Sequence, residues 1–186
     1  MLTPSVSERL ARLFDNEVAA WTFPASIAEL AEPRFTGEEL YQRAKSFVEA
    51  LNRKSLLIRA DGHVAPRQLR FSGMSFVPDL EIVEFETRHL AVEVKFIREV
   101  DPSGSITKAM GQVLLYKSLG FKQAHALIVD TRLSSDALEL QHDVEKLLLP
   151  DGIACSVFVR NATGTLCTIR NTPSATDSKA HGMTTT

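Results

Sequence analysis

Three charged residues in the middle of the chain have types and spacing that could carry chemistry. Glu93 and Lys95 are separated by one residue within an otherwise apolar run, and Asp79 follows Pro78 at the start of an earlier apolar run. In a β-strand, residues i and i+2 lie on the same face, roughly 7 Å apart between Cα atoms. Glu93 and Lys95 are therefore expected to stand side by side. If the two runs pair as a hairpin, Asp79 reaches the same end of it.

Two carboxylates and an ammonium group together suit a hard divalent cation. Mg²⁺ takes oxygen ligands and keeps several of its waters, so two carboxylates with a gap between them can hold it, and Mn²⁺ can substitute. A bound cation lowers the pKa of its water and polarises a phosphate oxygen. A lysine beside it can orient the attacking water or stabilise the developing oxyanion. The set of Asp79, Glu93 and Lys95 thus favours metal-dependent hydrolysis of a phosphodiester.

The pattern of apolar residues predicts the elements that position this set. Helical spacing predicts helices over 5–21, 37–52, 106–119 and 134–148. Alternating or continuous apolar runs predict strands over 55–60, 76–85, 90–97, 125–130, 153–159 and 165–169, with a weaker candidate at 67–71. The order of these elements predicts an α/β domain with a mixed sheet.

The polar segment between the runs 76–85 and 90–97 predicts an antiparallel hairpin. A turnover near Thr87 and Arg88 places Asp79 across from about residue 96. Other signals mark the neighbouring helices. Thr36 and Glu39 form a capping box before the helix at 37–52, and Gly120 ends the helix at 106–119.

The central residues resemble the motif of a known family. Pro78-Asp79, thirteen intervening residues and then Glu93-Val94-Lys95 are similar to the motif of the PD-(D/E)xK nuclease superfamily. Gln112 and Tyr116, four residues apart on the next expected helix, resemble the QxxxY motif of its RecB-like branch. The resemblance covers roughly residues 36–130. It implies a restriction-endonuclease-like fold, in which helices flank a mixed β-sheet core in the order αβββαβ.

The resemblance also implies roles for individual residues at the strand ends. Asp79 and Glu93 would be the metal ligands, and the carbonyl of Val94 would be an additional ligand. Lys95 would be the catalytic lysine. The cofactor implied is Mg²⁺.

On the helices, the resemblance implies that Gln112 supports the site or the substrate backbone and that Tyr116 braces it. Many members also present a glutamate from the first core helix. Glu39 is the first choice for this role, and Glu38 and Glu49 stay open because spacing does not decide which side chain faces the site.

The function that the resemblance implies is a metal-dependent nuclease acting most readily on DNA, an endonuclease with a role in defence, repair or recombination. One alternative is a non-catalytic nucleic-acid-binding or assembly module on the same fold. Another is an RNA-cleaving, ligand-activated effector nuclease. Cutting both strands with one site per chain would require a homodimer or a partner protein.

Each motif also has an ordinary structural interpretation. Glu93 and Lys95 could be a solvent-facing pair on an amphipathic strand, and Gln112 and Tyr116 a half-buried helix face. The remaining strand acids, Glu81, Glu84 and Glu86, are interpreted as a solvated strand edge, with Glu81 the best spare ligand because it shares a face with Asp79.

Charge distribution changes what net charge alone suggests. The 186 residues carry 21 basic and 23 acidic side chains, a net charge of −2 that argues against a strongly basic nucleic-acid binder. Yet residues 41–70 hold seven Lys or Arg and two Asp or Glu, a local difference of +5. A basic face there would hold phosphates and make binding salt-dependent. Dispersed solubilising charges are the alternative.

Length and composition set the domain organisation. We expect a helical extension over 1–35, one nuclease-like domain over 36–170, and a disordered tail over 171–186. No apolar run is long enough to span a membrane. Cys155 and Cys167 lie in strand-like runs and are predicted to be buried free thiols, which indicates a reducing, cytoplasmic location.

Overall fold

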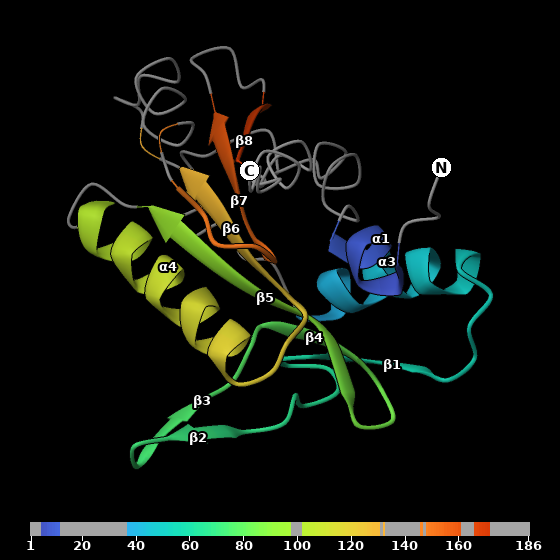
Figure 1. Cartoon of the computed structure of the whole chain (residues 1–186). Helices are drawn as coiled ribbons and strands as arrows, with labels where there is room; N and C mark the ends of the chain where they lie inside the picture. The colour runs from blue at the N-terminus through green and yellow to red at the C-terminus, as the bar shows by residue number, and fades with distance from the viewer. Residues whose placement is uncertain are drawn as a thin grey trace, which may run out of the picture.

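The central sheet of the computed structural model has six strands in the order β1-β4-β5-β6-β7-β8 (Figure 1). Their bounds are β1 (Leu56–Ala60), β4 (Leu80–Glu84), β5 (Thr87–Ile97), β6 (Gln123–Asp130), β7 (Ile153–Arg160) and β8 (Leu166–Asn171). The β5-β6-β7 pairs are parallel and the other pairs are antiparallel, so the sheet is mixed, as predicted. The structure describes residues 5–11, 37–97, 102–130, 132, 146, 148–160 and 166–171.

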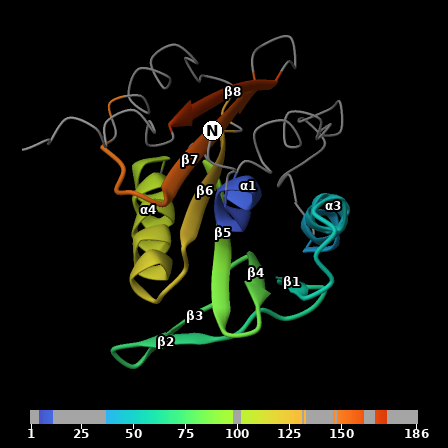
Figure 2. The same ribbon diagram turned by 45° about the vertical axis from the view of Figure 1, so that its right-hand side comes forward.

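Helices cover both faces of this sheet. On one face lies α4 (Pro102–Ser118), and on the other lie α1 (Val6–Ala11) and α3 (Gly37–Ala50), as Figures 1 and 2 show. The α/β class is therefore confirmed. Among the described residues, no helix combines the length and apolar character needed to cross a bilayer.

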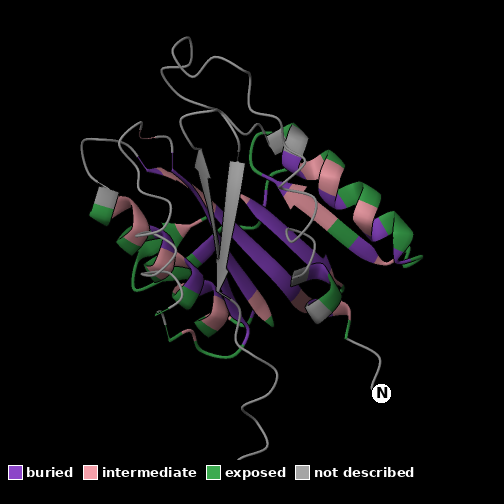
Figure 3. Ribbon diagram, turned by 90° about the horizontal axis from the view of Figure 1, so that it is seen from above, coloured by how far each residue is buried: buried purple, intermediate pink, exposed green. Residues whose placement is uncertain are grey.

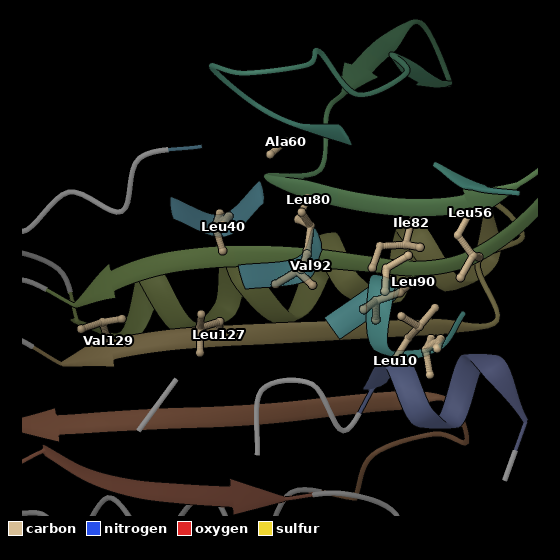
Figure 4. Close-up of a cluster of buried hydrophobic side chains, with 13 residues drawn as sticks. Leu10, Leu40, Leu56, Ala60, Leu80, Ile82, Leu90, Val92, Leu127 and Val129 are labelled. Carbon is tan, nitrogen blue, oxygen red and sulfur yellow. The ribbon is translucent and has the colours of Figure 1, made fainter. Parts of the chain in front are cut away.

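Alternation along β5 separates two apolar clusters. Leu90 and Val92 point into the cluster under α1 and α3, part of which is drawn in Figure 4. Ala91 and Ile97 point into the cluster under α4. The predicted assignment of odd and even residues to opposite faces is thus confirmed. Burial of the central strands, purple in Figure 3, removes each large aliphatic side chain from water, which is worth about 1.5–3 kcal/mol per residue.

A small hairpin is inserted between β1 and β4. It consists of β2 (Leu69–Phe71) and β3 (Met74–Phe76), which pair only with each other. Ser72 and Gly73 form its turn with φ values of 48° and 78°, as a tight two-residue hairpin loop requires. The sequence predicts only a weak strand over 67–71, which overlaps β2. It does not predict β3, two of whose three residues, Met74 and Ser75, are exposed.

Most of the remaining predicted elements can be compared directly. The helix expected over 37–52 is α3, and the one expected over 106–119 is α4, which begins four residues earlier, at Pro102. Gly120 follows α4 with a φ of 96°, so its predicted role as the helix stop is confirmed.

The closing hairpin predicted over 153–169 is formed by β7 and β8. Of the helix predicted over 5–21, the structure describes 5–11, and α1 (Val6–Ala11) is helical. The helix predicted over 134–148 lies almost wholly outside the described residues, as does the tail beyond 171.

The predicted register between β4 and β5 is wrong by about three residues. The chain turns over at Phe85 and Glu86, so the polar residues expected in the turn belong to β5. They are accommodated because the fold supplies partners. Arg88 donates to the Leu119 carbonyl at 2.6 Å, and the buried His89 contacts a helix. The last pair of the ladder is Leu80 with Val92, which places Asp79 beside Glu93 rather than opposite Phe96.

Candidate active site at the fork between two strands

The β4 and β5 strands diverge at the residues that the sequence motif predicts to form a site. We call this place, where Asp79 lies beside Glu93, Val94 and Lys95, the fork. Pairing with β4 ends at Val92, whereas β5 continues to Ile97 against β6 alone. Asp79, just before β4, fills the gap: the Val94 N–H donates a hydrogen bond to its Oδ2 atom at 2.6 Å. The N–H and C=O of a strand residue point to the same neighbour. The Val94 carbonyl therefore faces the Asp79 side as well.

Glu93 is held from two directions on the α4 face of the sheet. Its side chain is only 2% exposed. Lys95 donates to Oε1, and the Tyr116 hydroxyl donates to Oε2 at 2.6 Å. The same hydroxyl lies 3.3 Å from the Val77 carbonyl oxygen. A tyrosine has one proton to donate, so the shorter contact to Glu93 is the one it makes.

The electrostatics of this group are those of crowded carboxylates. Burial raises the pKa of Asp79 to about 6, and the nearby charge of Glu93 adds to the effect. The Val94 N–H and the Lys95 ammonium oppose that rise. Burial also raises the pKa of Tyr116, as do the charges of Glu93 and Asp79, so its hydroxyl stays a donor. With both acids ionised, the Asp79, Glu93 and Lys95 side chains sum to −1, which favours an added cation.

The donor set at the fork fits a hard divalent cation. Two carboxylates and the Val94 carbonyl offer oxygen atoms only, which is the preference of Mg²⁺ and Mn²⁺ over softer metals. Within the described part of the chain, no three His, Cys, Asp or Glu side chains are grouped to hold a metal ion. A cation at the fork would thus rely on water for its other ligands, as Mg²⁺ commonly does.

Gln112 lies one helical turn before Tyr116 on α4. A hydrogen bond between the Gln112 side chain and the Tyr116 hydroxyl lowers the pKa of Tyr116. The larger effect of burial raises that pKa. Its Oε1 atom is buried and accepts no hydrogen bond from the described residues. An unsatisfied buried acceptor costs about 1–3 kcal/mol, so a donor arriving with water or a ligand would be stabilising here. The structure thus brings both QxxxY residues to the fork.

The glutamates of α3 do not join this group as far as they are described. Helix α3 covers the opposite face of the sheet from Glu93. Glu38 accepts from Gln42 at 2.6 Å and forms an ion pair with His63. Glu49 lines a cavity between α3 and β1. The side chain of Glu39, the preferred candidate, lies outside the described residues.

A buried ion pair next to the fork was missed by sequence reasoning. Glu81 is only 1% exposed, so the prediction of a solvated edge is wrong for it. It accepts from Arg59 Nη1 at 2.8 Å and from the Arg67 N–H at 2.9 Å. The usable signal was Arg59, the one charge in the strand 55–60, whose register partner is Glu81. With its charge balanced in this way, Glu81 is a poor spare ligand.

The other two strand acids differ from each other. Glu84 is half-buried and accepts hydrogen bonds from Arg53 and Ser55, so the solvated-edge prediction is wrong for it too. Its pKa is lowered, chiefly by the Ser55 hydroxyl and then by Arg53. Glu86 is exposed, as predicted.

The basic residues of 41–70 do not form one patch. Arg53 and Arg59 are paired with Glu84 and Glu81. Lys45 and Lys54 line the cavity between α3 and β1, whose volume is about 440 Å³ and which contains none of the fork residues. Arg67 and Arg70 are both exposed; Arg70 belongs to β2, and Arg67 lies two residues before that strand. Three of the seven basic residues of this segment, Lys45, Arg53 and Lys54, therefore line one cavity, whereas Arg59, Arg67 and Arg70 do not line it.

A second polar alignment ties α1 to the sheet. Ser7 Oγ lies 2.8 Å from His89 Nδ1, and His89 Nε2 lies 3.5 Å from Glu84 Oε2. The order Ser7, His89, Glu84 resembles the nucleophile, base and acid of a catalytic triad. However, Ser7 and His89 are both buried, and neither lines the cavity between α3 and β1. Desolvation lowers the pKa of His89, so it is neutral at pH 7. The alignment is an anchor for α1.

The cysteine prediction is confirmed for one residue. Cys155 is free and buried, and burial raises the pKa of its thiol to about 12, which makes it unreactive. The side chain of Cys167 lies outside the described residues. Comparison with protein-family models finds none that matches the chain, and comparison with curated proteins finds no significant match.

Proposed function

We propose that the protein is a metal-dependent nuclease that hydrolyses phosphodiester bonds, with DNA as the favoured substrate, on a restriction-endonuclease-like core. The observation that carries this proposal is the meeting of the Asp79 and Glu93 carboxylates beside Lys95 where β4 and β5 part. The order of elements supports it, since α3, β1, β4, β5, α4 and β6 give αβββαβ once the β2–β3 hairpin inserted between β1 and β4 is set aside. The predicted nuclease-like domain, 36–170, contains all of them.

Asp79, Glu93 and the Val94 carbonyl would hold Mg²⁺ or Mn²⁺, which supplies a polarised phosphate oxygen and a more acidic water. The chain's own residues do the rest. Tyr116 fixes one oxygen of Glu93, and Asp79 is oriented by the Val94 N–H. Both carboxylates are thus oriented before the substrate arrives, and such preorganisation lowers a barrier.

Lys95 supplies the charge that a phosphodiester needs. Its side chain is 24% exposed, so its ammonium group can reach a substrate while still contacting Glu93. There it would orient the attacking water and stabilise the charge that develops on the phosphate oxygens. The three side chains sum to −1, and a divalent cation brings the site to +1, which complements one phosphate.

A compartment and an assembly can also be proposed for the reaction. The buried free Cys155 suits a reducing, cytoplasmic compartment. Cleavage of both strands of a duplex would need a homodimer or a partner protein to bring a second site. An endonuclease of this kind would serve defence, repair or recombination.

A cleavage panel tests the proposal. Single-stranded DNA, duplex DNA and single-stranded RNA are incubated with the full chain in Mg²⁺, Mn²⁺ or EDTA. We expect metal-dependent cleavage of at least one DNA substrate. Salt-sensitive binding without cleavage in either metal would favour a non-catalytic module instead. Cleavage confined to RNA would favour the effector-nuclease alternative.

A further inference from the structure

The tip of the β2–β3 hairpin exposes two large apolar side chains. Phe71 and Met74 are register partners and are 52% and 54% exposed. At the base, Leu69 is buried and Phe76 packs against the cluster under α4. All four residues share one face of the hairpin, because side chains alternate along each strand. An apolar stripe therefore begins in the core and runs out into solvent.

The base of this hairpin is fixed next to the strand fork. Leu69 belongs to the same buried cluster as Tyr116, and the Tyr116 hydroxyl lies 3.3 Å from the carbonyl oxygen of Val77, just after β3. Figures 1 and 2 show the hairpin extending away from the main sheet. Met74 precedes Asp79 by five residues, so the tip lies at most about 17 Å along the chain from the fork. A polymer bound at Asp79 can reach it.

The charge of the hairpin points to an anionic polymer. Between Asp61 and Asp79 the sequence has no acidic residue and two arginines, Arg67 and Arg70. Both arginines are exposed. Arg70 lies on the face opposite Phe71, because the two are consecutive residues of β2. The hairpin thus has an aromatic side chain on one face and an exposed arginine on the other. Base stacking together with phosphate contact is the pairing by which proteins hold single strands.

We propose that the β2–β3 hairpin binds unpaired nucleotides of the substrate strand, with bases against Phe71 and Met74 and a phosphate at Arg70. This inference rests on the proposed nuclease function and names its substrate class, a strand with unpaired bases. In a duplex each base face is covered by its neighbours, so only splayed or single-stranded nucleotides offer a free face to Phe71. Stacking accepts any base, which makes the contact independent of sequence.

Fluorescence anisotropy of a labelled 20-nucleotide single-stranded DNA, titrated with the full chain in EDTA, tests the hairpin without cleavage. We expect Phe71→Ala to weaken binding about tenfold, as loss of one stacked base would. Phe85→Ala is the matched control, because Phe85 is 78% exposed at the β4–β5 turn and should leave binding within twofold. Arg70→Ala should reduce the slope of log affinity against log salt by about 0.7, the value for one single-strand phosphate contact.

Equal binding by the wild type and Phe71→Ala would overturn the hairpin inference. So would an equal loss on a fully paired duplex, or a change in sedimentation of Phe71→Ala with unchanged DNA binding, which would indicate a protein partner. Cleavage in Mg²⁺ separates this inference from the proposed function. Hairpin-dependent binding without wild-type cleavage refutes only the nuclease, whereas cleavage that is insensitive to Phe71→Ala at low substrate concentration refutes only the hairpin.

Discussion

The Asp79 carboxylate takes the hydrogen bond that a longer β4 strand would otherwise make to Val94. Its Oδ2 atom lies 2.6 Å from the Val94 nitrogen, at the point where β4 no longer pairs with β5. A neutral side chain could accept the same bond. A charged one is costly here, because burial and Glu93 raise the pKa of Asp79 to about 6. A charged group that is present although its charge destabilises the fold is typical of a functional site.

Asp79→Asn should stabilise the fold while abolishing cleavage. The amide oxygen can still accept from Val94, but the buried charge is gone. A rise in pKa from 3.8 to about 6 corresponds to at most about 3 kcal/mol at pH 7. Because Asp79 is half-buried and partly screened, we expect the free energy of unfolding to rise by about 1–2 kcal/mol. Urea denaturation in EDTA measures this, and a loss of stability would contradict the assignment.

Metal binding should weaken as the solution becomes more acidic than pH 6. The folded pKa of Asp79 is above its ordinary value, so its favourable contribution to stability is present below about pH 4 and is lost as pH rises through about 6. The ionised Asp79 carboxylate, which is the form that can bind a cation, becomes populated over the same rise in pH. Titration calorimetry with Mn²⁺ should show lower affinity at pH 5 than at pH 7.5. Equal affinities at the two values would argue against Asp79 as a ligand.

The sequence was sufficient to predict which face of β5 carries Glu93 and Lys95, but not the register of β5 against β4. Alternation alone predicts that Glu93 and Lys95 share a face opposite Val94. The position of Asp79 depends on where the chain turns, and Thr87 to His89 look like a loop because their polar partners come from distant elements. The register shift between Ile82 and Val83 has no local sequence signal. Together, the position of the turn and this register shift place Asp79 next to Glu93.

The helical contributions were predictable to different degrees. The four-residue spacing of Gln112 and Tyr116 requires a shared helix face, and Tyr116 contacts Glu93. Spacing along α3 does not determine which sheet face that helix covers. The Glu38 and Glu49 alternatives could therefore be judged only from packing. The Arg59–Glu81 pair escaped notice because single charges on edge strands are common on solvated surfaces.

Tyr116→Phe should impair both catalysis and folding. The ring is buried and would keep its packing, while Glu93 Oε2 would lose its 2.6 Å donor. A hydrogen bond to a charged group is worth about 1.5–3 kcal/mol, so we expect a loss of that order in the free energy of unfolding. Cleavage by the folded fraction should fall at least tenfold in kcat. A fully active Tyr116→Phe variant would show that Glu93 needs no brace.

Arg59→Leu should be among the most destabilising single changes near the fork. It leaves the Glu81 carboxylate buried without its ion-pair partner, which costs about 3–5 kcal/mol. Arg59→Leu combined with Glu81→Leu should recover much of that loss, because no charge is then buried alone. Thermal unfolding of the two single variants and the double variant measures the coupling. Arg70→Ala, an exposed arginine, is the control, and additive effects of the Arg59 and Glu81 changes would contradict the pairing.

The rate of Mg²⁺-dependent DNA cleavage by the wild type and by Lys95→Ala tests the central claim most directly. Lys45→Ala is the matched control, because Lys45 is an exposed lysine on α3, on the far side of the sheet. The fork site predicts that Lys95→Ala folds with an unchanged circular dichroism spectrum and loses cleavage by at least a hundredfold, while Lys45→Ala remains active. Cleavage by Lys95→Ala at the wild-type rate, or no cleavage by the wild type on any DNA substrate, would contradict it.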